Sequence, residues 1–468
     1  MMHGWGTAFV RGWFASIALA AMIGCGGSDD DSPADGGDAG DADGGGDAGG
    51  DDDGDDDGDD GSTCEGLECQ QVNCSGGAIT SLSGTVNIPS GQFPLYNATV
   101  YVPNAPVEAF EEGSGCYRCE DALSGDPLVE TTTDTAGQFV LEDVPVGEDI
   151  PLVVQVGKWR RQITIPSVAQ CVDTPLAAED IRLPRNQSEG DIPLIALTTG
   201  GLDALECLLP KVGLDPSEFT PAGEGGRVNF FGAVDGTPGY DMSMNGGVDF
   251  APATTLWDSL ENLSEYDIVL LSCEGTENPS NKSVEARDAL RDYANLGGRV
   301  FASHWHNFWI EFGADPFPTA ADFSHLADLG SIESDIDTSY EKGLAMAEWL
   351  MNVGASDTFA KLPIVDAQHT VLAVDQATRW IYQDVTTNDM PSVQYLSFNT
   401  PMDVEEEEQC GRLVLSDIHV SSASGDDSAP GIRYPNGCTS TDLSPQEMAL
   451  IFMLFDISAC IEPDDGVD

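Results

Sequence analysis

The clearest hydrophobic pattern of the chain lies in residues 266–309. Residues 268–272 form a nearly continuous apolar run, which is typical of a strand buried on both faces of a parallel sheet. Apolar positions then recur at close to helical spacing over residues 284–296, and the Gly-Gly pair that follows indicates the end of a helix. Residues 299–303 form a second apolar run. Strand, helix and strand in this order predict one right-handed parallel unit.

The same alternation of strand-like and helix-like segments extends over residues 190–463 and predicts an α/β domain. We expect an open, mostly parallel sheet with flavodoxin-like layers, in which helices cover both faces. The last predicted helix begins with Ser444 and a proline, and it has Glu447 at the capping-box position. The further predicted strands are 192–198, 378–382 and 411–418, with another beginning near 230, and the further predicted helices are 202–211, 345–351 and 444–458.

Residues 63–186 follow a different pattern, in which short segments of alternating apolar and polar residues are separated by turn residues. The alternation is clearest in residues 139–141 and 153–156. Because no helical period of any length intervenes, we predict a small β-sandwich for this part of the chain.

Residues 1–25 combine an early arginine, a short apolar segment and small residues before Cys25. This is the pattern of a secretory signal peptide and is too short for a membrane span. The tetrapeptide at 22–25 resembles a bacterial lipobox, which implies that Cys25 becomes the lipidated N-terminus of the mature protein. An ordinary signal peptide that happens to contain a cysteine is the alternative. The lipobox predicts a lipid-anchored protein of the cell envelope, and Gly26 in place of an aspartate favours the outer membrane or cell surface.

Residues 26–62 consist almost entirely of Asp, Gly and Ala, with sixteen Asp and no Lys or Arg. Such a segment cannot bury apolar surface, and its like charges extend it, so we predict a disordered acidic tether. Calcium binding is the alternative, although the spacing of the aspartates does not match a calcium loop. The formal net charge of the whole chain is −63, which excludes nucleic acid as a natural partner because phosphate binding needs basic patches.

Eleven cysteines follow Cys25, and an exported protein can oxidise them. The odd number leaves at least one unpaired, and we expect this to be Cys273, which stands at a strand end inside the α/β domain. The pair at 116 and 119 has the spacing of a redox or zinc motif, but without a second close pair a structural bridge is the preferred interpretation. From domain membership alone we expect the bridges Cys74–Cys171, Cys207–Cys460 and Cys410–Cys438.

A short basic stretch interrupts the acidic chain at residues 158–161. It gathers three of the eighteen basic residues around an aromatic side chain, in the order Lys158, Trp159, Arg160 and Arg161. Two interpretations remain open, a docking point for an anionic polymer or for the acidic face of the second domain, and a strand edge that is protected by charge. We expect Trp159 to pack inward under either of them.

The β-rich part resembles the carboxypeptidase-regulatory-like family of transthyretin-type sandwiches. The family marks the hairpin before its last strands with T-D-x-x-G-x-F, and here Thr133, Asp134, Gly137 and Phe139 match that pattern. The resemblance implies an accessory or adhesive module and does not imply peptidase activity.

Three motifs of the α/β part, YDIVLLSCEG, GGRVFASHWH and GRLVLSDIHV, resemble class I glutamine-amidotransferase-like domains, particularly the trehalose-utilisation type. In catalytic amidotransferases the strand after the Gly-Gly turn leads to a nucleophilic cysteine on a tight turn. Here His304 stands at that place, as a histidine does in the trehalose-utilisation type, and the late histidine of the family falls on His419. The missing nucleophile argues against glutaminase or peptidase activity.

Ligands of open α/β sheets bind beyond the carboxyl ends of the strands, and several of the few histidines of this chain stand there together with a cysteine and acidic residues. The residues at these ends are Cys273, Glu274, His304, His306, Asp417 and His419. We expect Glu274, His304 and His419 to line one pocket. His304, His306 and His419 are candidate ligands of a divalent metal ion that could activate water, whereas Cys273 is a candidate nucleophile with a histidine base and Glu274 beside it. A degenerate site of packed, inert side chains is the third interpretation.

His325 and His369 are isolated in the sequence, so we expect surface or packing roles for them, and we expect residues 405–408 to form a solvated acidic run. The function expected from these features is a binding or scaffold role of a cell-envelope lipoprotein, with an envelope glycan or protein as partner. The alternative is an extracellular metal-assisted or Cys/His hydrolase that acts on a small molecule or glycan. A redox role of the cysteines at 116 and 119 is a third possibility.

Overall fold

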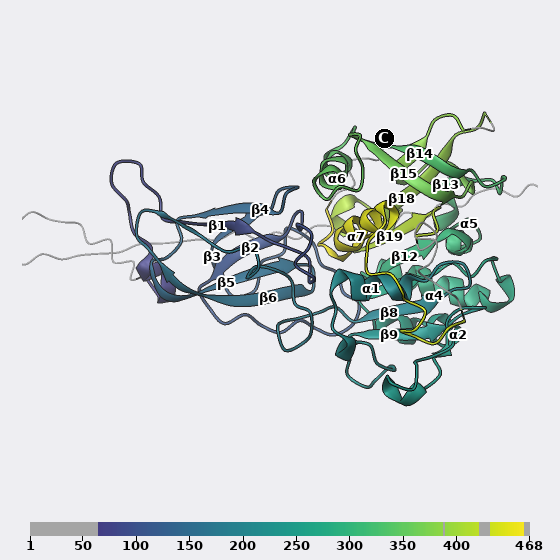
Figure 1. Ribbon diagram of the computed structural model, residues 1–468, viewed down its shortest axis with the longest axis horizontal. Helices are drawn as coiled ribbons and strands as arrows, with labels where there is room; N and C mark the ends of the chain where they lie inside the picture. Colours follow the sequence, from purple (N-terminus) through teal and green to yellow (C-terminus); the bar gives the residue numbers. More distant parts are fainter. Residues whose placement is uncertain (1–63, 387–388, 421–430, 463–468) are drawn as a thin grey trace, which may run out of the picture. The chain divides into compact units, whose positions relative to one another are not determined.

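The structure, a computed structural model, describes residues 64–386, 389–420 and 431–462 (Figure 1). These residues belong to one compact unit, residues 63–468. The predicted signal segment, Cys25 and the tether at 26–62 lie outside the described residues. Within the described ranges, no helix combines the length and the apolar character that a membrane span requires.

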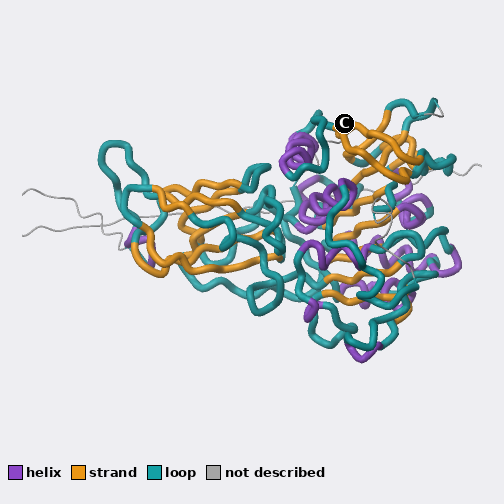
Figure 2. The backbone as a smooth tube through the Cα atoms, in the orientation of Figure 1, coloured by secondary structure: helices purple, strands orange, loops and turns teal. Residues whose placement is uncertain are grey.

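The described chain up to residue 186, here named the N-terminal β region, consists almost entirely of strands and loops (Figure 2). Leu82 and Phe139 from one of its sheets and Val100 and Val154 from the other belong to one hydrophobic core. The predicted all-β character is therefore confirmed, with two sheets that share a core. The three-stranded sheet has the order β4 (Gln138–Glu142), β1 (Ser81–Thr85), β7 (Asp173–Pro175), and the four-stranded sheet has the order β3 (Pro127–Thr132), β2 (Thr99–Pro103), β5 (Gly147–Val156), β6 (Trp159–Val168).

Residues 190–462, here named the large-sheet region, are built around one ten-stranded sheet. Its spatial order is β10 (Ala251–Pro252), β9 (Val228–Gly232), β8 (Ile195–Thr199), β11 (Ile268–Leu271), β12 (Arg299–Ser303), β19 (Gly411–Ser416), β18 (Ser392–Thr400), β17 (Thr378–Gln383), β14 (Gly330–Ile336) and β15 (Lys361–Ala367). The first six strands pair in parallel, and the pairings from β19 to β15 are antiparallel. The prediction of a mostly parallel sheet therefore holds only for the first six strands. Strands β17 and β18 follow each other without the long crossover that parallel pairing needs, so they pair antiparallel.

Helices cover both faces of the parallel strands, as predicted. Alternate residues of the central strands enter two separate cores, so that Leu270 belongs to the same core as residues of α1, α6 and α7, whereas Val269 belongs to the core that contains residues of α2 to α5. The helices of the first core are α1 (Leu208–Val212), α6 (Glu341–Asn352) and α7 (Pro445–Ser458), and those of the second are α2 (Thr254–Trp257), α3 (Leu260–Ser264), α4 (Val284–Asn295) and α5 (Phe308–Glu311). The core of the N-terminal β region is continuous with the first of these cores.

The predicted helices at 284–296, 345–351 and 444–458 are present as α4, α6 and α7. The capping box of α7 forms as expected, with Ser444 and Glu447 bonded reciprocally. The helix predicted at 202–211 is wrong in its first half, because the backbone N–H of Leu202 donates to the carbonyl of Cys273 at 3.0 Å and the α-helix starts only at Leu208. Sequence analysis did not predict β14, β15, β18, β13 (Ala321–Phe323) or β16 (Val371–Val374).

The described residues contain five disulfides and one free thiol, that of buried Cys273. The predicted free Cys273 and the predicted bridge Cys74–Cys171 are confirmed. The predicted bridges Cys207–Cys460 and Cys410–Cys438 are wrong, and the cysteines at 116 and 119 do not pair with each other. The loop around residue 117 instead reaches the large-sheet region, where sequence spacing cannot reveal which thiols come within bridging distance. The remaining bridges are Cys64–Cys69, Cys116–Cys410, Cys119–Cys460 and Cys207–Cys438.

The basic stretch at residues 158–161 is used inside the molecule. Lys158 Nζ pairs with Asp267 Oδ1 at 2.6 Å and also donates to the carbonyls of Glu111 and Gly113, so it joins the N-terminal β region to the start of β11. Arg160 pairs with Asp191, and Trp159 is fully buried, as expected. Arg161 donates to backbone carbonyls nearby. The contact of Lys158 with the large-sheet region is therefore its ion pair with Asp267.

Candidate functional site

Three chemically reactive side chains follow three neighbouring parallel strands. Cys273 comes two residues after β11, His304 follows β12 directly, and His419 comes three residues after β19. The register pairs Leu271 with Ala302, and Ser303 with Ser416, so the three strands end side by side. All three side chains are buried, with Cys273 fully covered and each histidine 4% exposed.

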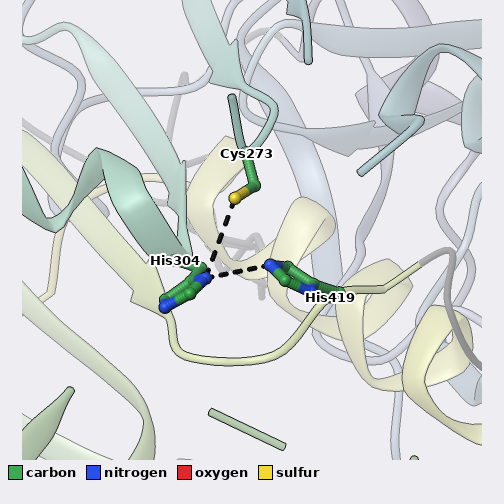
Figure 3. A group of neighbouring side chains, drawn as sticks. All are labelled: Cys273, His304 and His419. Carbon is green, nitrogen blue, oxygen red and sulfur yellow. Dashed lines mark hydrogen bonds between the residues drawn. The ribbon is translucent and has the colours of Figure 1, made fainter. Parts of the chain in front are cut away.

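The three side chains point toward one another (Figure 3) and are named the inner cluster from here on. Nδ1 of His304 lies 2.9 Å from Nε2 of His419, and Sγ of Cys273 lies 3.8 Å from the same Nδ1 atom. One nitrogen or sulfur atom from each residue lies within 4.8 Å of the other two. The structure therefore brings together His304 and His419, which the sequence predicted to share a pocket, and places beside them Cys273, the candidate nucleophile.

The backbone of His304 explains how its ring turns back toward its neighbours. Its φ angle is +37°, in the left-handed region that non-glycine residues seldom adopt, at the step from β12 into a 3₁₀ turn at His304–Asn307. Such conformations persist only where the surrounding structure enforces them, and they concentrate at functional sites. This is the position at which the amidotransferase resemblance predicted a tight turn.

Asp366 holds the outer nitrogen of His419, whose Nδ1–H donates to Oδ2 at 3.1 Å. Asp366 reaches the site because β15 ends in an isolated bridge between Ala367 and Ile418, which lies beside His419. Burial alone would lower the pKa of His419, but the hydrogen bond with Asp366 and the interaction with Cys273 raise it to about 10. Burial and the neighbouring His419 lower the pKa of His304, so His419 is the member of the pair that carries a proton.

Asp203 is hydrogen-bonded to both of the segments that carry the histidines of the inner cluster. It is fully buried, and its Oδ2 atom accepts hydrogen bonds from Ser303 Oγ at 2.7 Å and from the backbone N–H of Val420 at 3.2 Å. One carboxylate oxygen thus bonds the residue before His304 and the residue after His419. Sequence analysis missed both Asp203 and Asp366. The signal for Asp203 was its position four residues after β8, at the carboxyl end of a parallel strand.

Glu274 and His306 have other partners. Glu274 forms a buried ion pair with Lys282 and accepts from the backbone of Val234 at 3.4 Å. His306 is fully buried and accepts from Trp309 Nε1 at Nδ1, so its Nε2–H donates to the carbonyl of Ser272, both at 2.9 Å. Both ring nitrogens of His306 are therefore occupied by the fold, and the structure does not bring either residue into the inner cluster.

The other residues that the sequence analysis singled out do not belong to the inner cluster. Asp417 is buried and accepts from the backbone of Thr370 at 2.6 Å, and burial raises its pKa to about 6. His369 is a buried packing residue that bonds the carbonyl of Pro391, whereas His325 lies near the surface beside Glu311. The acidic run at 405–408 is exposed, as expected.

The inner cluster offers two kinds of chemistry. A thiolate and two imidazoles are a donor set that suits zinc and other borderline first-row metals. A histidine ligand that donates its other N–H to a carboxylate, as His419 does to Asp366, is the usual support of such a site. Alternatively, a protonated His419 beside Cys273 could activate the sulfur as a nucleophile. The backbone N–H of Gly275 donates to Cys273 Sγ at 3.5 Å.

No family model matches this chain, and no curated protein matches it either. Among solved structures, a ThuA-like protein from Bacteroides uniformis is similar over 56% of this chain and 89% of its own, at 9% identity and a TM-score of 0.28. A cohesin–X-dockerin complex from Acetivibrio cellulolyticus is similar over 30% of this chain and 75% of its own, at 16% identity and a TM-score of 0.16. Both TM-scores are too low to place the chain in a family.

Proposed function

We propose that the inner cluster binds one divalent transition-metal ion, zinc by preference, and that the chain is a metal-binding protein of the cell envelope. The observation that carries this proposal is the convergence of Cys273 Sγ, His304 Nδ1 and His419 Nε2 within 4.8 Å of one another. They come from three separate strand ends, so their meeting is not a by-product of local sequence. No Lys or Arg among the described residues forms an ion pair with any of the three.

The spacing of the donor atoms suits a metal ion with small side-chain adjustments. Ligand atoms around a tetrahedral zinc lie roughly 3.3 to 3.7 Å apart, given the usual Zn–N and Zn–S bond lengths. The distances here are 2.9 Å between the two nitrogens and 3.8 Å from sulfur to His304 Nδ1. A bound ion would replace the proton that the two imidazoles now share. Three protein ligands would leave the fourth position to water.

A second candidate function is a metal-assisted or Cys/His hydrolase that acts on an extracellular small molecule or glycan. The observation that favours it is the three-residue ligand set, because catalytic zinc sites keep an open position at which the ion lowers the pKa of water. Zinc-dependent hydrolysis of ester, amide or glycoside probes that is lost in His304→Ala would support this candidate. Hydrolysis that survives metal removal and ends on alkylation of Cys273 would assign the nucleophile mechanism instead.

The metal proposal can be tested with cobalt, because a cobalt–thiolate bond gives a charge-transfer absorption that cobalt bound to nitrogen and oxygen lacks. The intact protein should take up one Co²⁺ with this band, and Zn²⁺ should displace it. Cys273→Ser should remove the band, and His304→Ala should weaken uptake at least tenfold, since one of three ligands is lost. His325→Ala is the matched control and should leave the band unchanged. Absence of the band in the intact protein, or its persistence in Cys273→Ser, would refute the proposal.

We also propose that the protein is lipid-anchored through Cys25 at the outer membrane or cell surface, where an envelope glycan or protein is its partner. The lipobox-like motif supports the anchor, and the five disulfides of the described residues suit an oxidising compartment. Cys25→Ser should move the protein from the membrane fraction to the soluble fraction. Continued membrane binding of this variant would contradict the anchor.

A further inference from the structure

A second group of side chains that could bind a metal ion lies next to Trp305, whose indole also contacts His304. It consists of Glu277, Glu311 and His325 and is named the outer cluster. Nε2 of His325 lies 2.9 Å from Glu311 Oε2 and 3.7 Å from Glu277 Oε1. One donor atom from each residue lies within 4.8 Å of the others.

Three separate segments form the outer cluster. Glu277 lies in the loop after β11, Glu311 ends α5, and His325 follows β13. The indole of Trp305 stacks on His325, with ring centres 5.5 Å apart and planes 13° apart, and its centre lies 4.7 Å from that of His304. The indole therefore contacts one histidine of each cluster.

The charges of the outer cluster are incompletely balanced. Its two carboxylates are close together, and in the described part of the chain neither forms an ion pair with a Lys or Arg. Their ion-pair partner among the described residues is His325, and the nearby Lys282 donates to the backbone carbonyl of Glu277 and pairs with Glu274. Like charges at this separation repel, and a divalent cation between them would remove the repulsion. The side chains are 19% to 34% exposed, so an ion can reach them from solvent.

Asn307 provides an independent indication of a ligand. It is fully buried, and its Nδ2 donates to Glu311 Oε2 at 2.9 Å, so its amide nitrogen faces the outer cluster. The Oδ1 atom of the same carboxamide is buried and has no hydrogen-bond partner among the described residues. Leaving a buried acceptor unsatisfied is costly, so an unpaired amide oxygen in this position calls for a partner that the protein chain does not supply.

We propose that the outer cluster is a second metal site, which takes a hard divalent cation of the Mn²⁺ type. Carboxylate and amide oxygens suit Mg²⁺, Ca²⁺ and Mn²⁺, and the imidazole of His325 favours the transition metal among these. The outer cluster has no sulfur, whereas the inner cluster has Cys273. The two sites therefore select different ions, and the outer site does not depend on the zinc proposal for the inner one.

Electron paramagnetic resonance tests this proposal directly, because free Mn²⁺ gives a sharp signal that weakens when the ion binds. The experiment uses the full chain at about 0.15 M salt, where screening beyond roughly 8 Å suppresses diffuse binding by the many surface carboxylates. The intact protein should bind one Mn²⁺ that Glu277→Gln and Glu311→Gln bind at least tenfold more weakly. Glu333→Gln, at an exposed position of β14, is the matched control and should bind as the intact protein does.

Terbium luminescence gives a second measurement, since Tb³⁺ takes the same hard ligands and Trp305 lies close enough to sensitise it. Trp305→Phe should reduce the sensitised emission several-fold and leave Mn²⁺ binding intact. Paired variants distinguish the two sites, because His304→Ala should bind Co²⁺ at least tenfold more weakly and keep Mn²⁺, whereas His325→Ala should keep the cobalt–thiolate band and weaken Mn²⁺ binding. Full Mn²⁺ binding by Glu277→Gln, no binding by the intact protein, or equal loss of Mn²⁺ in His304→Ala would each overturn the proposal.

Discussion

The junction around Lys158 and the inner cluster are both buried and polar, but they stabilise their polar groups in opposite ways. At the junction Lys158 has a carboxylate and two backbone carbonyls as partners, and two disulfides hold the same pair of regions together. In the inner cluster two imidazoles face each other across 2.9 Å beside a thiol that remains unbridged.

This difference distinguishes a junction in which the fold pairs each buried charge from a cluster that we propose binds a metal ion. A buried charge that serves the fold is given a complementary partner, because an uncompensated one costs several kcal/mol. The inner cluster instead contains groups that compete for the same proton. In the proposed metal site, a cation would replace this proton. The following four predictions test this contrast, from the largest expected effect to the smallest.

Removal of both bridges at the junction should have the largest effect. The fourfold variant with alanine at positions 116, 119, 410 and 460 frees the chain from covalent loops of 294 and 341 residues. We expect the free energy of unfolding in urea to fall by about 5 kcal/mol, because long loops restrict the unfolded chain most. The control variant lacks Cys64–Cys69, which spans only five residues, and should lose about 2 kcal/mol. Equal losses would show that the junction does not depend on its bridges.

Lys158→Met tests the charge pairing at the same junction. The substitution leaves Asp267 buried without its closest cation, so the free energy of unfolding should fall by about 3 kcal/mol at pH 7. Adding Asp267→Asn should recover most of this loss, since no buried charge then remains unpaired. If the double variant is no more stable than Lys158→Met, packing of the lysine stem matters more than its charge.

Glu206 provides the contrasting case of a buried carboxylate without an ion pair to Lys or Arg among the described residues. It is hydrogen-bonded to Thr237, and burial raises its pKa from 4.5 to about 7. Between these values the folded protein holds a proton that the unfolded chain has lost, so this group makes stability fall as pH rises from about 4.5 to about 7. Glu206→Gln should remove this pH dependence and raise stability at pH 8 by about 2 kcal/mol.

Thermal unfolding across this pH range measures the effect. Asp267→Asn cannot serve as the control because it breaks an ion pair, so Asp322→Asn at an exposed position is used and should leave the slope unchanged. An unaltered slope in Glu206→Gln would mean that other carboxylates determine the pH dependence.

Asp366→Asn should have the smallest effect, because it changes the support of a ligand and leaves all three ligands present. Zinc affinity, measured by competition with a chelator, should fall about tenfold, which is near 1.4 kcal/mol. An asparagine can still accept from His419 Nδ1, but it no longer favours a basic imidazole. Asp203→Asn provides a comparison at the other end of the two histidine segments. Unchanged affinity in both variants would contradict the supporting role of the two carboxylates.

The sequence predicted the centre of the large-sheet region well, and the reason is physical. The segments that became β11, α4 and β12 are contiguous and buried, so their apolar patterns are strong and local. The convergence of His304 and His419 followed from the rule that parallel strands end at one edge of a sheet. The free Cys273 followed from the odd number of cysteines.

The other parts depend on contacts that no local pattern encodes. Asp366 belongs to β15, which lies at the far edge of the sheet. A single bridge between Ala367 and Ile418 brings this part of β15 to the site. Glu274 was expected beside the histidines. It instead forms an ion pair with Lys282, because this lysine is buried and needs a counter-charge. The antiparallel half of the sheet was missed because strands such as β14 are partly exposed and carry weak apolar runs. The partners of the cysteines at 116 and 119 were missed because the fold itself brings them together.

The two long bridges also determine what a single backbone cleavage does to this protein. Cys119 is joined to Cys460, so the loops between them lie within one closed covalent ring. A protease that cuts one of these loops opens the ring but releases no fragment, and the strand ends that carry Cys273, His304 and His419 stay connected. Such a cut is invisible on a non-reducing gel, where the protein still migrates as one chain, and it appears as two fragments only after a thiol reductant is added.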